Sequence, residues 1–212
     1  MTGMTDTGDA RIKDITRFDV GLDQTWHPVP LDDDGADNWA EELVASFDLR
    51  GSAADLPWFQ LARVRANLQE IGDPTVTSVV WIPLPESGYV SCVLSFTLSA
   101  LEPTDTLDAV FADLEADRQR STDEHQFLEV DVWRGILAAE PFVAARNLII
   151  NRSPGDLEGS VEERTVFAVI PDSARQMAQF VFSAESIGAF YDITSQSQAV
   201  VDTLQIELAD PR

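Results

Sequence analysis

The sequence predicts an α+β fold, with a single domain in which helices pack on an antiparallel sheet of about five to seven strands. Between Thr75 and Ala184, several stretches alternate apolar and polar residues, which is the period of a half-buried strand. Segments on either side repeat apolar residues at helical spacing. The strands between Gln126 and Ala184 follow one another too closely for the helical crossovers of about a dozen residues that parallel pairing requires.

The chain has 212 residues, 44% of them apolar, which suits one large domain with a buried core. Residues 1–16 are polar and show no apolar pattern, so we expect a flexible N-terminal lead followed by a single α+β domain over residues 17–212. No run of 18 apolar residues is present, and the N-terminal stretch lacks the apolar segment of a signal peptide. We therefore expect a cytoplasmic protein that does not enter a membrane.

The first third of the chain predicts a strand, a turn and two helices. The strand is "RFDVGL" and the turn is "WHPVP". A helix follows, because apolar residues recur at i, i+4 and i+8 from Trp39. A second helix is expected over about residues 56–71, with Asp55 as a possible cap, Pro57 tolerated in its first turn and Gly72 at its end.

The middle of the chain predicts a β-hairpin. "YVSCVLSFTL" alternates almost perfectly, and "TVTSVVWIPL" is its expected partner across the turn "PESG". Cys92 falls on the apolar face of this strand, so we interpret its thiol as a packing group rather than a reactive one.

The remaining elements are a helix, four strands, a second helix and a short strand. The first helix is expected at about Asp105–Arg120 and the second at about Gly188–Thr203, with "QIEL" as the last strand. The four strands between the helices are "QFLEVDVWR", "FVAARNLIIN", "SVEERTVFAVI" and "RQMAQFVFSA".

The stretch "PLDDDGADNWAEEL" comes close to the calcium loop of an EF-hand. With Gly35 at the sixth position of such a loop, the first position is Pro30, which offers no carboxylate ligand. The plainer interpretation is that Asp34 or Asp37 caps the following helix, whose N-terminus favours negative charge. We expect no tight calcium site, no other metal site and no cofactor, with a weak cation site as the alternative.

Charge is the strongest compositional signal, with 37 acidic and 14 basic residues and a formal net charge of −23. Such a surface disfavours nucleic acids and anionic membranes and favours a protein partner with a basic surface. The charge is uneven, because nine acidic residues and no basic one lie between residues 19 and 49. We expect a binding surface that includes Asp32, Asp33, Asp34 and Asp37. The acidity has an alternative explanation in composition. Lys13 is the only lysine, a bias that a GC-rich genome would produce, and adaptation to a salty cytoplasm is a further option.

Trp58 and Phe59 are adjacent at the start of the second helix. Neighbouring helical residues point about 100° apart, so both cannot lie deep in the same core. Either one packs inward and the other covers the helix junction, or one is exposed and anchors a partner, as aromatic residues often do.

Catalytic motifs are absent from the sequence, which contains no G-x-S-x-G, P-loop, H-E-x-x-H or C-x-x-C pattern. His27 and His125 are the only candidates for proton transfer near neutral pH, and no local signature supports either. We therefore assign no catalytic residue.

The order of elements resembles the PsbP-like fold family. The resemblance rests on "RFDVGLDQTWHPVP" followed by "WAEEL", and on the closing "FVFSAESIGAFYDITSQSQAVVDTLQIEL". It implies an N-terminal strand and turn, a helix, a central antiparallel sheet and a C-terminal helix on the sheet; the helix at about 56–71 departs from the simplest version. Most members of the family bind proteins, such as photosystem subunits or the GTPase Ran, rather than act as enzymes. No binding residue of the family maps onto this sequence.

These observations favour a non-catalytic protein-interaction module, such as an adaptor, a secretion-linked chaperone or an immunity-type inhibitor. The alternative is a small-ligand-binding protein or an enzyme whose pocket is assembled from scattered residues.

Overall fold

The computed structural model describes residues 13–31, 38–47, 49, 52–73, 75–85, 89–137, 140–152, 159–185 and 192–210. The elements in chain order are β1 (Asp14–Asp19), β2 (Trp26–Val29), α1 (Trp39–Ser46), α2 (Ser52–Ile71), β3 (Thr77–Trp81), β4 (Cys92–Ala100), α3 (Leu107–Ala116), β5 (His125–Leu137), β6 (Glu140–Asn151), β7 (Ser160–Val169), β8 (Gln176–Ala184), α4 (Ile193–Val201) and β9 (Gln205–Ala209). A short 3-10 turn, Asp117–Gln119, continues α3.

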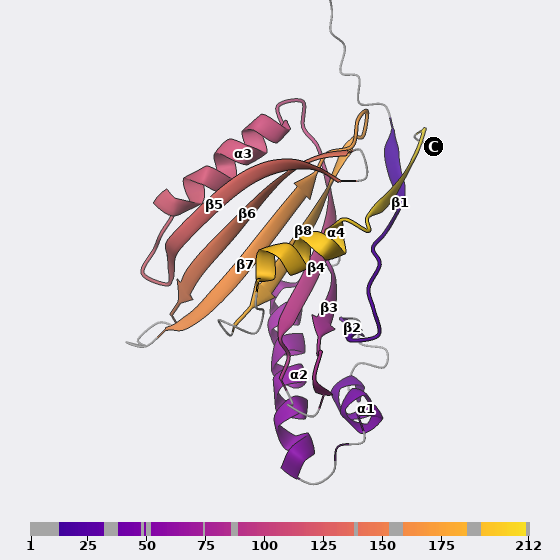
Figure 1. The fold of residues 1–212 in the computed structure, drawn as a ribbon, viewed down its shortest axis with the longest axis vertical. Coiled ribbons are helices and arrows are strands. Elements are labelled where there is room, and N and C mark those ends of the chain that lie inside the picture. Colours follow the sequence, from indigo (N-terminus) through magenta and orange to yellow (C-terminus); the bar gives the residue numbers. More distant parts are fainter. Residues whose placement is uncertain are drawn as a thin grey trace, which may run out of the picture.

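Seven strands form one antiparallel sheet in the order β2-β3-β4-β8-β7-β6-β5, as Figure 1 shows. β1 and β9 pair in a separate two-stranded sheet. The prediction of a single α+β domain with an antiparallel sheet is confirmed, and so is the hairpin of β3 and β4. The β4–β8 pairing joins that hairpin to the later strands and makes one continuous surface.

α4 lies across one face of this sheet (Figure 1). Side chains alternate between the two faces of each strand, and on this face Phe167, Phe180 and Phe182 are fully buried. Ile193 and Leu204, at the two ends of the α4 segment, complete the same core.

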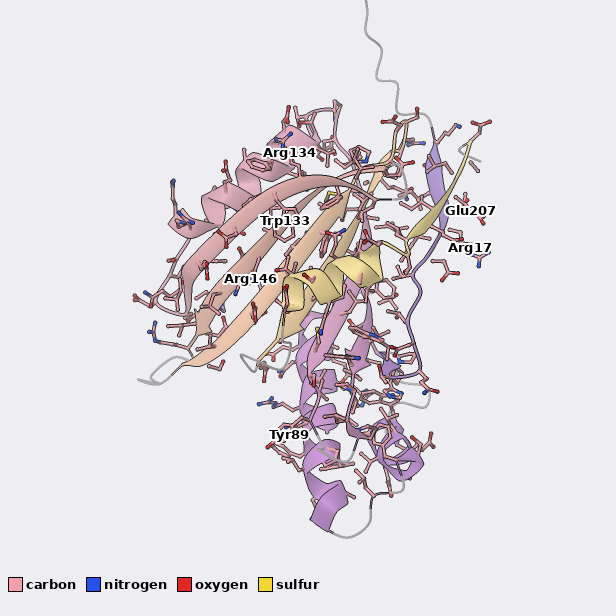
Figure 2. All side chains as sticks on the ribbon, in the orientation of Figure 1. Arg17, Tyr89, Trp133, Arg134, Arg146 and Glu207 are labelled. Atoms are coloured by element: carbon pink, nitrogen blue, oxygen red, sulfur yellow. The ribbon has the colours of Figure 1, made fainter. Side chains whose placement is uncertain are left out.

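α2 and α3 cover the opposite face. Leu61 of α2 is fully buried in a second apolar cluster with Val44 of α1 and Val80 of β3. α3 packs over β5 and β6, where the Arg134 guanidinium lies 4.4 Å from the Phe111 ring centre and 2.5 Å from Asp108. Figure 2 shows Arg134 on this side of the sheet.

β2 corrects the expectation of a turn at "WHPVP". Residues 26–29 pair with β3, and Pro28 lies opposite Val79. Proline cannot donate a ladder hydrogen bond, so it is tolerated in an edge strand, and β2 is the edge of the sheet. This strand was not predicted because it contains a proline and is too short to show an alternation of apolar and polar residues.

Two predicted boundaries are also shifted toward the N-terminus. α2 begins at Ser52 rather than near Leu56, because Pro57 removes only one hydrogen bond close to an open helix end. β1 begins at Asp14, so residues 14–16 belong to the folded domain through their pairing with β9. Residues 1–12, the rest of the expected lead, lie outside the described residues. The predicted end of α2 is correct, since Gly72 has a φ of 66°, a left-handed conformation that favours glycine.

No helix among the described residues is long and apolar enough to cross a bilayer.

Candidate functional site

The N-terminal half of α2 exposes three large apolar side chains within four residues. Leu56 is 44% exposed, Trp58 48% and Phe59 60%. Pro57 and Leu61, about one turn apart, are buried against the core and fix the rotation of the helix. Because successive residues turn by about 100°, Trp58 and Phe59 must point away from that core. The expectation that one of them packs inward is not met, and both lie at the surface.

This half of α2 extends with α1 past the end of the main sheet (Figure 1). Tyr89 is 55% exposed and borders the same helix, as Figure 2 shows. The next residue, Val90, donates its backbone N–H to the Gln60 side-chain oxygen at 2.9 Å, which ties α2 to the start of β4. The exposed apolar side chains are therefore carried by a helix that is anchored at its middle.

A hollow of about 500 Å³ separates α1 from this half of α2. Its lining consists of Glu41, Val44, Ala45, Leu49, Ala54, Asp55 and Trp58. The two charged groups of this lining are both carboxylates, and its other residues, including Trp58, are apolar. Such a surface is complementary to the long apolar stem and cationic head of a lysine or arginine side chain.

The acidic site residues predicted from the sequence are only partly placed. Asp32, Asp33, Asp34 and Asp37 lie outside the described residues. Glu41 and Glu42 are exposed in the first turn of α1, where negative charge is favoured. The N-cap position belongs to Asn38, whose side chain makes no capping hydrogen bond. The expectation that Asp34 or Asp37 occupies the N-cap is therefore wrong, because the helix begins later.

A second concave surface lies between the C-terminal half of α2 and the sheet. This groove has a volume of about 450 Å³. Its lining consists of Val64, Asn67, Leu68, Ile71, Val76, Val93, Ser95, Glu162, Arg164, Val181, Ser183 and Glu185. A smaller hollow of about 250 Å³ adjoins it, and the two share Val64, Val93, Ser183 and Glu185. An Arg63–Glu185 ion pair of 2.5 Å links α2 to the end of β8 at this point.

The polar end of this groove is built around Glu162, which is only 4% exposed. Arg164 donates to its carboxylate from Nε at 2.7 Å and from Nη2 at 2.9 Å. Asn151 donates from Nδ2 at 2.7 Å, and the Ser183 hydroxyl donates as well. Burial alone would raise the pKa of Glu162, but the charge of Arg164 and these hydrogen bonds outweigh it and lower that pKa. The carboxylate is therefore held ionised.

The histidines and the cysteine are placed as structural groups. His27 packs its ring against Phe47, with centroids 5.5 Å apart, and burial lowers the pKa of His27. His125 contacts the Asn151 side-chain oxygen through Nδ1 at 2.9 Å. Cys92 is buried, and burial raises the pKa of its thiol far above the ordinary value, as expected for a packing residue. Within the described residues, no group of three or more His, Cys, Asp or Glu side chains is arranged to hold a metal ion.

Neither the groove nor its polar end was predicted from the sequence. Glu162 and Arg164 are two residues apart in "SVEERTVFAVI", so they share one face of β7. A charged pair at alternate positions of a strand whose second half is apolar was the available signal. Their partners Ser183 and Asn151 come from other strands, and only the sheet register brings them together.

No family model matches the sequence, and no curated protein matches it either. Among solved structures, the chain is similar to cyanobacterial PsbP (CyanoP) from Synechocystis sp. PCC 6803, with 10% identity and a TM-score of 0.48 over 98% of this chain and 99% of the other. It is also similar to PA94 from Pseudomonas aeruginosa, a protein of unknown function titled a putative regulator, with 8% identity and a TM-score of 0.40 over 60% of this chain and 80% of the other. The resemblance to the PsbP-like fold stated from the sequence agrees with the first of these matches.

Proposed function

We propose that this protein is a non-catalytic, cytoplasmic interaction module that binds a partner protein with a basic surface. The N-terminal half of α2 is the contact surface. The observation that carries the proposal is the exposure of Leu56, Trp58 and Phe59 within one turn of that helix.

Exposed apolar clusters of this kind support a binding role for two reasons. A single exposed apolar residue is ordinary, but contiguous ones mark interaction surfaces. Tryptophan and tyrosine are also enriched among the residues that dominate binding energy; Trp58 lies on α2 and Tyr89 borders this helix. A partner that covers this patch would remove its apolar area from water, at about 25 cal/mol per Å².

The charge around the patch supports a basic partner. Glu41 and Asp55 line the hollow beside Trp58, and no basic residue lines it. The whole chain carries a net charge of −23, which attracts and orients a basic surface during encounter. The aromatic side chains then supply the contact that holds the complex together.

Site-specific photo-crosslinking tests the proposal. A benzoyl-phenylalanine placed at position 59 of the full chain, in the native cell, should capture one predominant protein with a basic surface. The same label at position 136 is the matched control, because Ile136 is 74% exposed on β5, away from α2. Purified captured protein should bind the wild-type chain and lose affinity for Trp58→Ala. Capture of the same proteins from positions 59 and 136, or unchanged affinity of the variant, contradicts the proposal.

A further inference from the structure

The groove between the C-terminal half of α2 and the sheet is independent of the proposed protein contact. We infer that it is a binding site for a small uncharged amphiphile, whose aliphatic chain lies along α2 and whose carbonyl or hydroxyl oxygen accepts a hydrogen bond from Arg164. Its volume of about 450 Å³ falls within the range of ligand pockets, about 300–1,000 Å³.

The walls of the groove select an aliphatic chain. Its apolar lining consists of Val64, Leu68, Ile71, Val76, Val93 and Val181, without an aromatic ring. Val64, Leu68 and Ile71 follow one another along a single face of α2, and they extend about 10 Å along the helix axis at a rise of about 1.5 Å per residue. Ile71 is 68% exposed at the open end. The apolar surface is thus elongated, which fits an extended chain better than a compact ring.

The polar end supplies a fixed hydrogen-bond donor. Two donors of Arg164, Nε and Nη2, hold the Glu162 carboxylate. A guanidinium has five N–H groups in one plane, and among the described residues Nη1 has no hydrogen-bond partner. The Arg164 side chain is 37% exposed and the Glu162 side chain is 6% exposed, so the donors of Arg164 are the accessible part of the pair. Glu162 therefore orients Arg164 and leaves Nη1 for a ligand oxygen.

The charges around the groove favour an uncharged ligand. Arg164 is already neutralised by Glu162, and Arg63, which lines the adjoining hollow, is paired with Glu185. A carboxylate ligand would place a further negative charge beside Glu162, in a chain whose net charge is −23. An ammonium head group has no acceptor to offer Nη1. A neutral oxygen, as in an amide, ester or alcohol, meets both requirements.

Titration of the full chain with octanamide, followed by the ¹³C-methyl signals of Leu68, Ile71 and Val181, tests the inference. We expect saturable shifts of these signals with octanamide. Octanoate should bind at least about tenfold more weakly than octanamide. Arg164→Lys keeps a positive charge beside Glu162 but removes the planar donor, so it should weaken octanamide binding about tenfold. Leu68→Trp fills the groove and should abolish binding.

The matched control is Ile136→Trp, the same kind of enlargement at an exposed aliphatic residue of β5, and it should leave the affinity unchanged. Three results overturn the inference: no saturable shift of the groove signals, equal affinity for octanoate and octanamide, or octanamide binding that survives Leu68→Trp. If Arg164→Lys fails to fold, Leu68→Trp and the comparison of the two probes decide the question.

Discussion

Glu162 is a charged side chain that the fold buries almost completely and satisfies with four donated hydrogen bonds. The donors come from β6, β7 and β8: Asn151, Arg164 at two nitrogens, and Ser183. An ion pair in such a position contributes little beyond what apolar packing would, but the removal of one partner leaves the other uncompensated. Glu162 is therefore more important for holding Arg164 in place than for net stability.

Glu162→Ala should lower the free energy of unfolding by about 2–3 kcal/mol, below the range for fully buried pairs because Arg164 is partly exposed. The variant leaves Arg164, Asn151 and Ser183 without their common acceptor. Chemical denaturation measures the change. Glu207→Ala is the control: Glu207 is 66% exposed and 3.8 Å from Arg17 (Figure 2), so its loss should change stability by less than about 1 kcal/mol. Equal effects from the two substitutions would contradict the role given to Glu162.

His27 should make stability depend on pH. Burial lowers the pKa of His27 below 6.5 in the folded state, so below pH 6.5 the unfolded chain binds a proton more readily than the folded chain does. Stability should therefore be at its highest above pH 6.5 and fall as the pH drops from 6.5 through the folded-state pKa. His27→Gln should flatten this part of the profile when denaturation midpoints are compared between pH 7.5 and 5.5. An unchanged profile would show that His27 is not the titrating group.

At the scale of elements, the local patterns in the sequence identified those strands and helices that show their own periodicity. β4 and β8 carry an apolar residue at every second position of their apolar face, and both are strands as predicted, although β4 begins at Cys92 rather than Tyr89. β2 has four residues and a proline, and only its pairing with β3 makes it a strand. β1 owes its early start to β9, which lies almost 200 residues later. Strands that exist only because they pair with a distant segment could not be predicted from the local sequence pattern.

The candidate sites also depend on contacts between distant segments, so they could be predicted only in part. Trp58 and Phe59 are neighbours in one helix, so the sequence predicted that both could not lie deep in the same core, but not that both are exposed. The rotation that exposes both depends on the burial of Pro57 and on the packing of Leu61 against α1 and β3, which are tertiary features. The groove requires three strands and a helix to meet, and no single segment indicated it.

Gly135 in β5 offers a test of the sheet's packing. A Cβ atom at this position would collide with the ring of Phe142, its cross-strand partner, and Phe142 is 4% exposed in the core. Gly135→Ala should therefore destabilise the protein by about 1–3 kcal/mol through overpacking. In a strand with open space, the same substitution would stabilise by reducing the freedom of the unfolded chain. A higher midpoint of thermal unfolding for the variant would contradict the packing described for this strand.

At the scale of the whole molecule, the net charge of −23 should act on the rate of encounter with the partner. Association should slow steeply between about 0.05 and 0.5 M salt, as the Debye length falls below about 5 Å. Neutralisation of Asp32, Asp33 and Asp34 to asparagine should reproduce part of that slowing at low salt. Stopped-flow association rates with the captured partner measure both effects. If the association rate changes neither with salt nor with the triple substitution, the acidity reflects composition and does not contribute to binding.

The central claim is that the aromatic surface of α2 holds a protein partner, and the dissociation rate of that complex tests it most directly. Trp58→Ala combined with Phe59→Ala should accelerate dissociation by about 30-fold or more, the equivalent of about 2 kcal/mol from interface anchors. The association rate should stay within about twofold of wild type, because no charge changes. Ile136→Ala, a substitution at a still more exposed apolar residue away from α2, should leave both rates unchanged. A dissociation rate of the double variant equal to that of wild type would contradict the claim.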